Sequence, residues 1–330
     1  MNSKRWIALI AAVVLFAFSI GFRFTMQLTS SFMNDVFDIE DDFIEETMIE
    51  DGDMSNRIAK LSLRGQIMET EQAPFASVEG FNEERLLEQI ERAGEDDTIK
   101  AILFEVDSPG GDVGITSHIH RQITEMQEEY EKPIYVTMGS SAASGGYYVS
   151  APADKIFAEP STLTGSIGVI MQSINFGGFL EKHGVDFMTI KSDKHKDIMS
   201  PARDMTKEEK KIMQSMVDEM YDEFIDVVVD GRGMDEGTVR ELADGRVYTG
   251  KQAEENGLVD EVGTYDDALA ALKDDYDLED AAVIEYNNNL DFFTSFGASM
   301  NNLFNKDNLN LDTIKSMVQQ SNEPRILYMN

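Results

Sequence analysis

Hydrophobic and polar positions follow two patterns from residue 57 onward, and together these predict an α/β fold. Residues 99–106 and 133–138 are near-continuous apolar runs, typical of strands buried on both faces of a parallel sheet. Residues 58–67 alternate like a strand, whereas 83–93 and 112–130 carry apolar residues at helical spacing. Strand, glycine turn and helix recur in this order along the chain. We therefore expect units of strand, helix and parallel strand with right-handed crossover connections.

The middle of the chain predicts two more strands and one long helix. Residues 167–174 and 185–190 have strand-like composition. Thr206 and Glu209 have the spacing of a capping box, which opens a helix. Apolar residues then recur every four positions and form one stripe, suited to the core or to a subunit partner. The stripe consists of Ile212, Met216, Met220, Phe224 and Val228.

Shorter helices are expected at three further places. One covers residues 145–150, and two more begin at Thr249 and Thr264, each with a polar side chain at the capping position. After Asp275 the pattern weakens into scattered Asn and Asp residues. We therefore expect an α/β domain over 57–275, which would carry any catalytic site, and a loosely attached tail over 276–330.

The amino terminus has the pattern of a membrane anchor. Two basic residues, Lys4 and Arg5, come directly before the predicted anchor over residues 6–24. Its apolar run over residues 6–22 spans roughly 25 Å as a helix, near the lower limit for crossing a bilayer. A cleavable signal peptide is the alternative, because residues 17–19 resemble a cleavage site. In both cases residues 1–5 stay in the cytoplasm, an acidic linker follows over 25–56, and the α/β domain lies on the extracytoplasmic side of the cell membrane.

Composition excludes several classes of partner and cofactor. The chain has 62 acidic and 28 basic residues and a net charge of −34, which disfavours binding to nucleic acid. It contains no cysteine, which excludes disulfides, cysteine-ligated metals and a cysteine nucleophile. We expect neither a cofactor nor a metal, so covalent catalysis would have to use another side chain.

Two glycine-rich segments carry the candidate chemistry. Residues 107–111, Asp-Ser-Pro-Gly-Gly, end a buried strand, and Ser144 lies in the Ser-Ala-Ala-Ser-Gly-Gly run that follows the next strand. Strand ends of this kind are where α/β proteins bind ligands. Ser144 is a candidate nucleophile, and the N–H groups of Gly111 and Gly145 are candidate oxyanion donors. Both segments also suit ordinary turns and caps, and the Gly-x-Ser-x-Gly elbow of α/β hydrolases is absent.

A serine nucleophile needs a base, and two kinds of residue can supply it. Of the four histidines, His195 is the serious candidate for the base. His118 and His120 point to different faces of one helix, which argues against a metal pair, and His183 suits a helix end. A lysine is the other option, provided that burial removes its proton. Residue types alone leave both open.

The sequence resembles the signal peptide peptidase family, the Ser-Lys serine proteases related to protease IV, in its short single-unit form. The resemblance covers residues 57–273 and implies a fold similar to crotonase and Clp protease, built of stacked β-β-α units and here preceded by a transmembrane helix. The segments that carry it are residues 107–111, 141–148, 163–169, 191–201 and 244–250.

The resemblance assigns a role to each site residue. It implies that Ser144 attacks, that Lys196 is the general base, that Ser166 orients the lysine amine and that Gly111 stabilises the oxyanion. In the long form of the family the lysine and the serine lie in different halves. A short chain is therefore expected to form a homo-oligomer in which Lys196 of one subunit meets Ser144 of the next, and its substrates are expected to be remnant signal peptides and other peptides.

Two other classes of function remain as alternatives. A membrane-tethered, non-catalytic scaffold with the crotonase-like fold would need neither Ser144 nor Lys196. An acyl-CoA enzyme would use the glycine N–H groups on a thioester oxygen, but the acidic surface would repel the phosphates of CoA.

Overall fold

The computed structural model describes residues 44–68, 81–288 and 326–328. From Glu46 onward these residues belong to one compact unit. The predicted anchor over 6–24 lies outside them, as does most of the acidic linker. Across the described ranges, no helix combines the length and the apolar character that crossing a bilayer requires.

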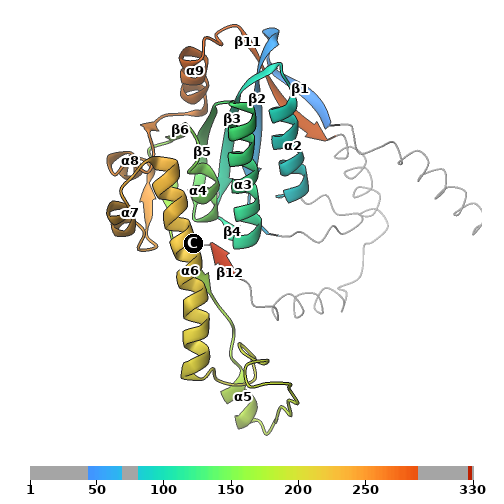
Figure 1. Cartoon of the computed structure of the whole chain (residues 1–330), viewed down its shortest axis with the longest axis vertical. Helices are drawn as coiled ribbons and strands as arrows, with labels where there is room; N and C mark the ends of the chain where they lie inside the picture. The colour runs from blue at the N-terminus through green and yellow to red at the C-terminus, as the bar shows by residue number, and fades with distance from the viewer. Residues whose placement is uncertain (1–43, 69–80, 289–325, 329–330) are drawn as a thin grey trace, which may run out of the picture. The chain divides into compact units, whose positions relative to one another are not determined.

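A mostly parallel sheet forms the centre of the molecule (Figure 1). Its main path runs through β1 (Ile44–Glu50), β11 (Ala281–Asn288), β2 (Asp53–Arg64), β3 (Ile99–Ser108), β5 (Ile134–Ala143), β6 (Lys155–Ala158) and β10 (Glu261–Val262). Every neighbouring pair from β11 to β10 is parallel. The first part of β5 pairs with β6, and its last residues pair in parallel with β7 (Leu163–Gly165). β7 pairs in turn with the antiparallel β9 (Val247–Thr249).

Helices cover the sheet, and their first residues are set by side-chain caps. They are α2 (Glu83–Glu95), α3 (Val113–Tyr130), α4 (Gly145–Ser150), α6 (Lys207–Arg232), α7 (Glu236–Leu242), α8 (Gly250–Glu255) and α9 (Tyr265–Asp275). Asp112 caps α3 by accepting a hydrogen bond from the N–H of Ile115. Thr206, Thr249 and Thr264 each form a full capping box, which confirms the three predicted helix starts.

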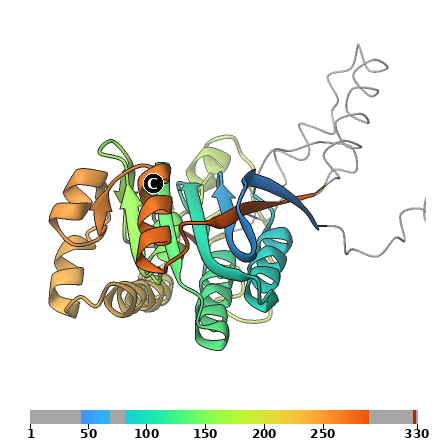
Figure 2. The same ribbon diagram turned by 90° about the horizontal axis from the view of Figure 1, so that it is seen from above.

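Both faces of the central strands are buried, as their apolar runs predict. Ala101 and Leu103 of β3 pack with Leu269 and Leu272 of α9. Because strand side chains alternate between faces, Ile102 points to the opposite face, where it is also fully buried. Seen from above, helices lie on either side of the strands (Figure 2).

Two segments differ from the sequence-based expectations. Residues 276–330 were expected to form a loose tail, yet Ala281–Asn288 are a strand between β1 and β2, with Val283 fully buried. Residues 167–174 form only the two-residue β8 (Ile170–Met171), and 185–190 form no strand. Residues 185–190 are mostly exposed and pair with no described strand, so their β-branched residues have no sheet to join there.

An arm leaves the sheet after β8. It contains α5 (Gly177–Lys182), a loop over residues 183–206, and the first half of α6 (Figure 1). The predicted apolar stripe of α6 is buried in one half of the helix and partly exposed in the other. Phe224 and Val228 are fully buried, and Phe224 packs edge-on against Tyr148 of α4, whereas Ile212 and Met216 are about one-third exposed. The carboxyl half of α6 therefore packs on the core, and the amino half extends beyond it.

Candidate active site

Ser144 occupies a strained turn between a strand and a helix. β5 ends at Ala143 and α4 begins at Gly145, and the serine between them has φ 55° and ψ −118°. A non-glycine residue in this region costs of the order of 1–3 kcal/mol and persists only where its surroundings enforce it. Such a turn is the geometry that nucleophilic serines use to present their hydroxyl at the end of a sheet.

The hydroxyl of Ser144 is buried and lacks a partner. Its residue is 0% exposed, and among the described residues no group forms a hydrogen bond with Oγ. A buried unpaired hydroxyl costs about 1–3 kcal/mol. Strain and lost hydrogen bonding thus coincide at one side chain, as expected of a group kept for chemistry rather than for stability.

The turn after β3 brings Gly111 beside this serine. The N–H of Ile67 donates to the carbonyl of Gly110 (2.9 Å), and the N–H of Asp112 donates to the carbonyl of Ile67 (2.7 Å). Because hydrogen bonds alternate in direction along a strand, the N–H of Gly111 points away from Ile67. A Cβ on Gly111 would lie 1.8 Å from the Ile67 carbonyl oxygen, so only glycine fits.

Gly145 completes this part of the site. A Cβ placed on Gly145 would lie 3.3 Å from the backbone nitrogen of Gly111 and 3.2 Å from Cα of Gly110. The two glycines that the sequence predicts as oxyanion donors are therefore neighbours in space. Gly145 is also the first residue of α4, where backbone N–H groups have no partner within the helix.

Ser166 lies on the next strand end. The N–H of Ser144 donates to the carbonyl of Gly165 (2.7 Å), and Ala143 and Gly165 are paired in the sheet. Both Gly165 and Ser166 have positive φ, 75° and 50°, and the N–H of Ser166 donates to the carbonyl of Arg246 (2.8 Å). Four of the five predicted site residues thus lie together at the carboxyl ends of β3, β5 and β7.

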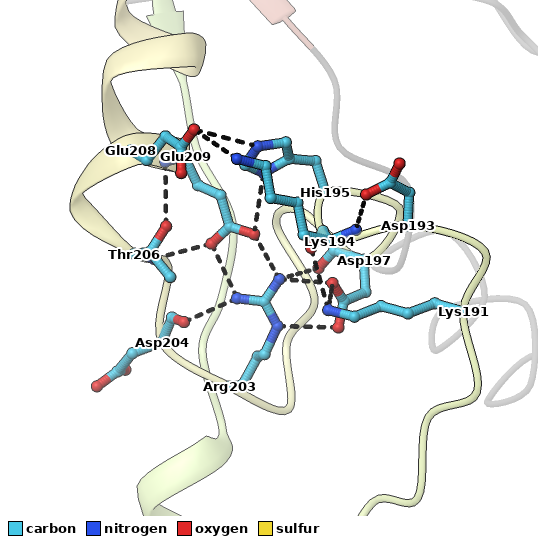
Figure 3. Close-up of polar contacts among 10 residues, drawn as sticks. All are labelled: Lys191, Asp193, Lys194, His195, Asp197, Arg203, Asp204, Thr206, Glu208 and Glu209. Carbon is cyan, nitrogen blue, oxygen red and sulfur yellow. Dashed lines mark hydrogen bonds and ion pairs between the residues drawn. The ribbon is translucent and has the colours of Figure 1, made fainter.

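Lys196 is not among them. It is exposed and lies in the arm loop, next to Asp197, which Arg203 ties to Glu209 in the first turn of α6 (Figure 3). Phe224, which contacts α4, lies roughly 22 Å further along that helix, given a rise of about 1.5 Å per residue. Because Oγ of Ser144 has no hydrogen-bond partner among the described residues, Lys196 forms no hydrogen bond with it within one chain.

No histidine forms a hydrogen bond with Ser144 Oγ within the described part of the chain. His195 lies beside the amino end of α6, with Nε2 3.6 Å from Oε1 of Glu208 and Nδ1 3.8 Å from Oε1 of Glu209. His118 pairs with Glu83, His120 packs edge-on against Tyr148, and His183 caps the end of α5 as predicted. Across the residues with described positions, no cluster of three potential metal-binding side chains occurs.

A short strand from the carboxyl terminus runs along the glycine edge. The backbone of β12 (Ile326–Tyr328) pairs antiparallel with β4 (Gly111–Asp112), placing residue 328 opposite Gly111. On its other side β12 pairs antiparallel with β8. An extended segment of polypeptide therefore fits between β4 and β8, on the side to which the Gly111 N–H points. This contact was not predicted, because three apolar residues at 326–328 are too few to establish a strand pattern.

A methionine-rich cavity lies next to β8. Its volume is about 680 Å³, and it lies between the start of the arm and the first half of α6. Its lining includes Met171, Ile174, Met199, Met205 and Met213. Methionine side chains are flexible and polarisable, so such a cavity adapts to apolar groups of different shape.

Comparison with known proteins shows which family this chain belongs to. Peptidase family S49 matches residues 126–279. The chain is 42% identical over 303 residues to a protein of Enterococcus faecium that carries the name signal peptide peptidase SppA, covering 89% of this chain and 88% of that one. It is 34% identical to protease 4 of Haemophilus influenzae, over 69% of this chain but 37% of the relative, and 36% identical to the chloroplastic serine protease SPPA of Arabidopsis thaliana, over 58% and 28%. The chain therefore belongs to peptidase family S49, the serine proteases that include signal peptide peptidase SppA and protease 4.

Proposed function

We propose that this protein is a membrane-anchored serine endopeptidase that degrades remnant signal peptides with a Ser144–Lys196 dyad. The observation that carries the proposal is the state of Ser144. Its backbone is strained, its hydroxyl is buried and unpaired, and two glycines that can bind an oxyanion lie beside it. The predicted anchor would hold the catalytic domain at the extracytoplasmic face of the membrane.

The reaction proceeds by acyl transfer. Neutral Lys196 takes the proton of the Ser144 hydroxyl as its oxygen attacks the scissile carbonyl carbon. The N–H groups of Gly111 and Gly145 stabilise the negative oxygen that forms. The lysine then gives the proton to the leaving amine, and the peptide bond breaks. Water, deprotonated by the same lysine, hydrolyses the ester and frees Ser144. Ser166 orients the lysine amine. It directly follows Gly165, whose carbonyl accepts the hydrogen bond from the Ser144 N–H.

The lysine comes from a second copy of the chain. Within one chain Lys196 lies exposed in the arm loop, and Oγ of Ser144 has no hydrogen-bond partner among the described residues. The arm also exposes large apolar side chains, among them Phe187, Met188 and Ile190, which are 65%, 93% and 96% exposed. Apolar surface of this kind suits contact with another subunit. A homo-oligomer would bury it and bring Lys196 to the neighbouring Ser144.

Two features favour apolar peptides as substrates. The edges of β4 and β8 already pair with an extended segment, and peptides commonly bind to such edges by adding a strand. The methionine-rich cavity next to β8 suits apolar side chains. Signal peptides are rich in apolar residues, and the predicted anchor would place the site where they remain after secretion.

Hydrolysis of a synthetic signal peptide tests the proposal. Ser144→Ala and Lys196→Ala should each lose activity, while His195→Ala should keep most of it. A serine-directed acylating probe should label the wild-type protein and not Ser144→Ala. If Lys196→Ala cleaves normally and His195→Ala does not, the base is the histidine. If the probe labels neither protein and no peptide is cleaved, a non-catalytic scaffold is the better description.

A further inference from the structure

The loop that carries Lys196 is tied down by one arginine. Nε of Arg203 donates to Oδ2 of Asp197 (2.9 Å), and Nη2 donates to Oδ1 (2.6 Å) and to the backbone carbonyl of Asp197 (3.1 Å). A planar guanidinium that grips a carboxylate with two parallel bonds fixes both its position and its orientation. Asp197 is the residue directly after Lys196, so the backbone next to the lysine is fixed with it.

The other side of the same guanidinium is fixed to α6. Nη1 and Nη2 donate to Oε2 (2.9 Å) and Oε1 (2.6 Å) of Glu209, which is 2% exposed. Glu209 also accepts from the N–H of Thr206 (2.8 Å) as part of the capping box. Figure 3 shows the guanidinium lying between the two carboxylates. Arg203 therefore connects the lysine loop rigidly to the first turn of a long helix.

Two lysines add contacts to this loop: Nζ of Lys191 donates to Oδ1 of Asp197 (2.6 Å), and Nζ of Lys194 donates to Oε1 of Glu208 (2.7 Å). The Lys194–Glu208 pair is largely exposed, so it holds the loop to α6 less firmly than the Arg203 fork does. Next to Lys196 the loop's backbone bonds are short-range turns, such as Lys196 N–H to Asp193 carbonyl (3.2 Å) and Ser200 N–H to Asp197 carbonyl (3.0 Å), and a longer-range bond joins Phe176 N–H to the Pro201 carbonyl (2.7 Å). Met199 has a φ of 63°, a conformation that is unfavourable for methionine unless its surroundings enforce it. A loop of this kind keeps one conformation only when its surroundings hold it, and Arg203 supplies the contact with a buried carboxylate of α6.

Arg203 also balances charge around the lysine. The charged and titratable groups near this loop are Lys191, Lys194, His195 and Arg203 on one side and Asp193, Asp197, Asp204, Glu208 and Glu209 on the other. Its hydrogen bonds hold the pKa of Glu209 down to about 2 and the pKa of Asp197 well below its usual range. Both carboxylates are therefore ionised at any working pH. Without Arg203 each carboxylate would lose its main partner, leaving Asp197 with Lys191 and Glu209 with the N–H of Thr206, and the added net negative charge would favour the protonated form of a nearby amine.

We propose that Arg203 is a positioning residue for the general base: its two-sided grip on Asp197 and Glu209 holds the Lys196 loop in the shape that enters the neighbouring subunit's site. This inference rests on the proposed role of Lys196. It assigns Arg203 no contact with the substrate. Arg203 acts through the backbone next to Lys196 and through the charge of the two carboxylates.

The test compares Arg203→Ala and Arg203→Lys with a matched control, Arg240→Ala. Arg240 also donates to two carboxylates, those of Glu236 and Asp222 (2.8 Å each), but it belongs to α7. Peptide hydrolysis is measured against pH for all three, with Lys196→Ala in parallel. For Arg203→Ala we expect kcat to fall about 30- to 100-fold, KM to change by less than about threefold, and the pH of half-maximal activity to rise. Arg203→Lys keeps the charge without the fork, so its pH midpoint should stay near that of wild type while its kcat falls less.

The outcomes separate this inference from the proposed function. If Lys196→Ala retains activity, the proposed base is wrong, and Arg203 has no base to position. If Lys196→Ala is inactive but Arg203→Ala matches Arg240→Ala, the positioning role is overturned. It is also overturned if Arg203→Ala and Arg203→Lys lose activity equally with the wild-type pH midpoint, because that result indicates loss of structure alone.

Mixed oligomers show which subunit carries the effect. Arg203→Ala is added either to the Ser144→Ala chain, which donates only lysine, or to the Lys196→Ala chain, which donates only serine. If Arg203 positions the lysine of its own chain, activity in the mixture should fall in the first case and not in the second. An equal loss in both mixtures, or a loss in the second alone, overturns the inference.

Discussion

The backbone N–H of Ser144 donates to the carbonyl of Gly165 across 2.7 Å, which ties the strained serine to the end of the neighbouring strand. The bond holds β5 and β7 in register at the point where both strands end. Ser166 follows Gly165 directly, so the same bond sets the spacing between the two serines. The nucleophile and the residue proposed to orient its base are thus part of one rigid edge.

Removing the Ser144 hydroxyl should stabilise the fold while abolishing activity. Ser144→Ala deletes a buried unpaired hydroxyl, and Ser144→Gly also relieves the positive φ, so each should raise the free energy of unfolding by about 1 kcal/mol. Urea denaturation followed by circular dichroism measures this. A lower unfolding free energy for both variants would mean that the hydroxyl is structural.

Gly111→Ala should disable the site by displacing β4. The added Cβ would lie 1.8 Å from the carbonyl oxygen of Ile67, so the strand must move and take its N–H with it. We expect kcat to fall about 100-fold or more, as for loss of an oxyanion donor. Gly178→Ala is the control, because a Cβ there has no atom within 4 Å. Equal activity in the two variants would exclude Gly111 from the mechanism.

His120 should make the fold less stable in mild acid. Burial lowers the pKa of His120 from 6.5 to about 4, so protonation favours the unfolded chain. The stability is complete above pH 6.5 and falls as the pH drops toward 4, by about 2 kcal/mol between pH 7.5 and 5. His120→Phe keeps the edge-on contact with Tyr148 but cannot titrate. Its unfolding free energy should fall less over this pH range than that of wild type, and identical pH dependence would contradict the assignment.

Removing β12 should increase activity on peptides. A chain that ends at residue 325 leaves the edges of β4 and β8 unpaired, so an extended substrate no longer competes with β12 for them. The effect should appear mainly as a lower KM in steady-state hydrolysis. A chain that ends at residue 328 keeps β12 and serves as the control. Unchanged KM in the shorter chain would show that peptides bind elsewhere.

The parts of the fold that depend on local pattern could be predicted from the sequence. The near-continuous apolar runs identified β3 and β5, and the threonine capping boxes marked the starts of α6, α8 and α9. β11 was missed because its apolar run is short and lies between acidic and asparagine-rich stretches. A strand was expected at 185–190 because β-branched and aromatic residues favour strands, but a strand needs a neighbour, and the arm offers none there.

Part of the candidate site could likewise be predicted from the sequence, and part of it could not. Ser144, Gly111 and Ser166 follow strand ends, and a parallel sheet brings such ends together without further information. The separation of Lys196 from Ser144 depends on which half of α6 packs on α4, and a stripe of uniform spacing does not reveal that. Arg203 was not singled out because its two partners, at positions 197 and 209, become meaningful only once the loop folds back on the helix.

In the proposed mechanism, catalysis needs a lysine and a serine that belong to different copies of the chain. The direct measurement mixes Ser144→Ala with Lys196→Ala protein, allows subunits to exchange, and follows cleavage of a synthetic signal peptide. Each variant alone should be inactive, and the mixture should recover a substantial fraction of wild-type activity, because some sites then combine an intact serine with an intact lysine. Full exchange of subunits with no recovered activity would contradict a shared dyad.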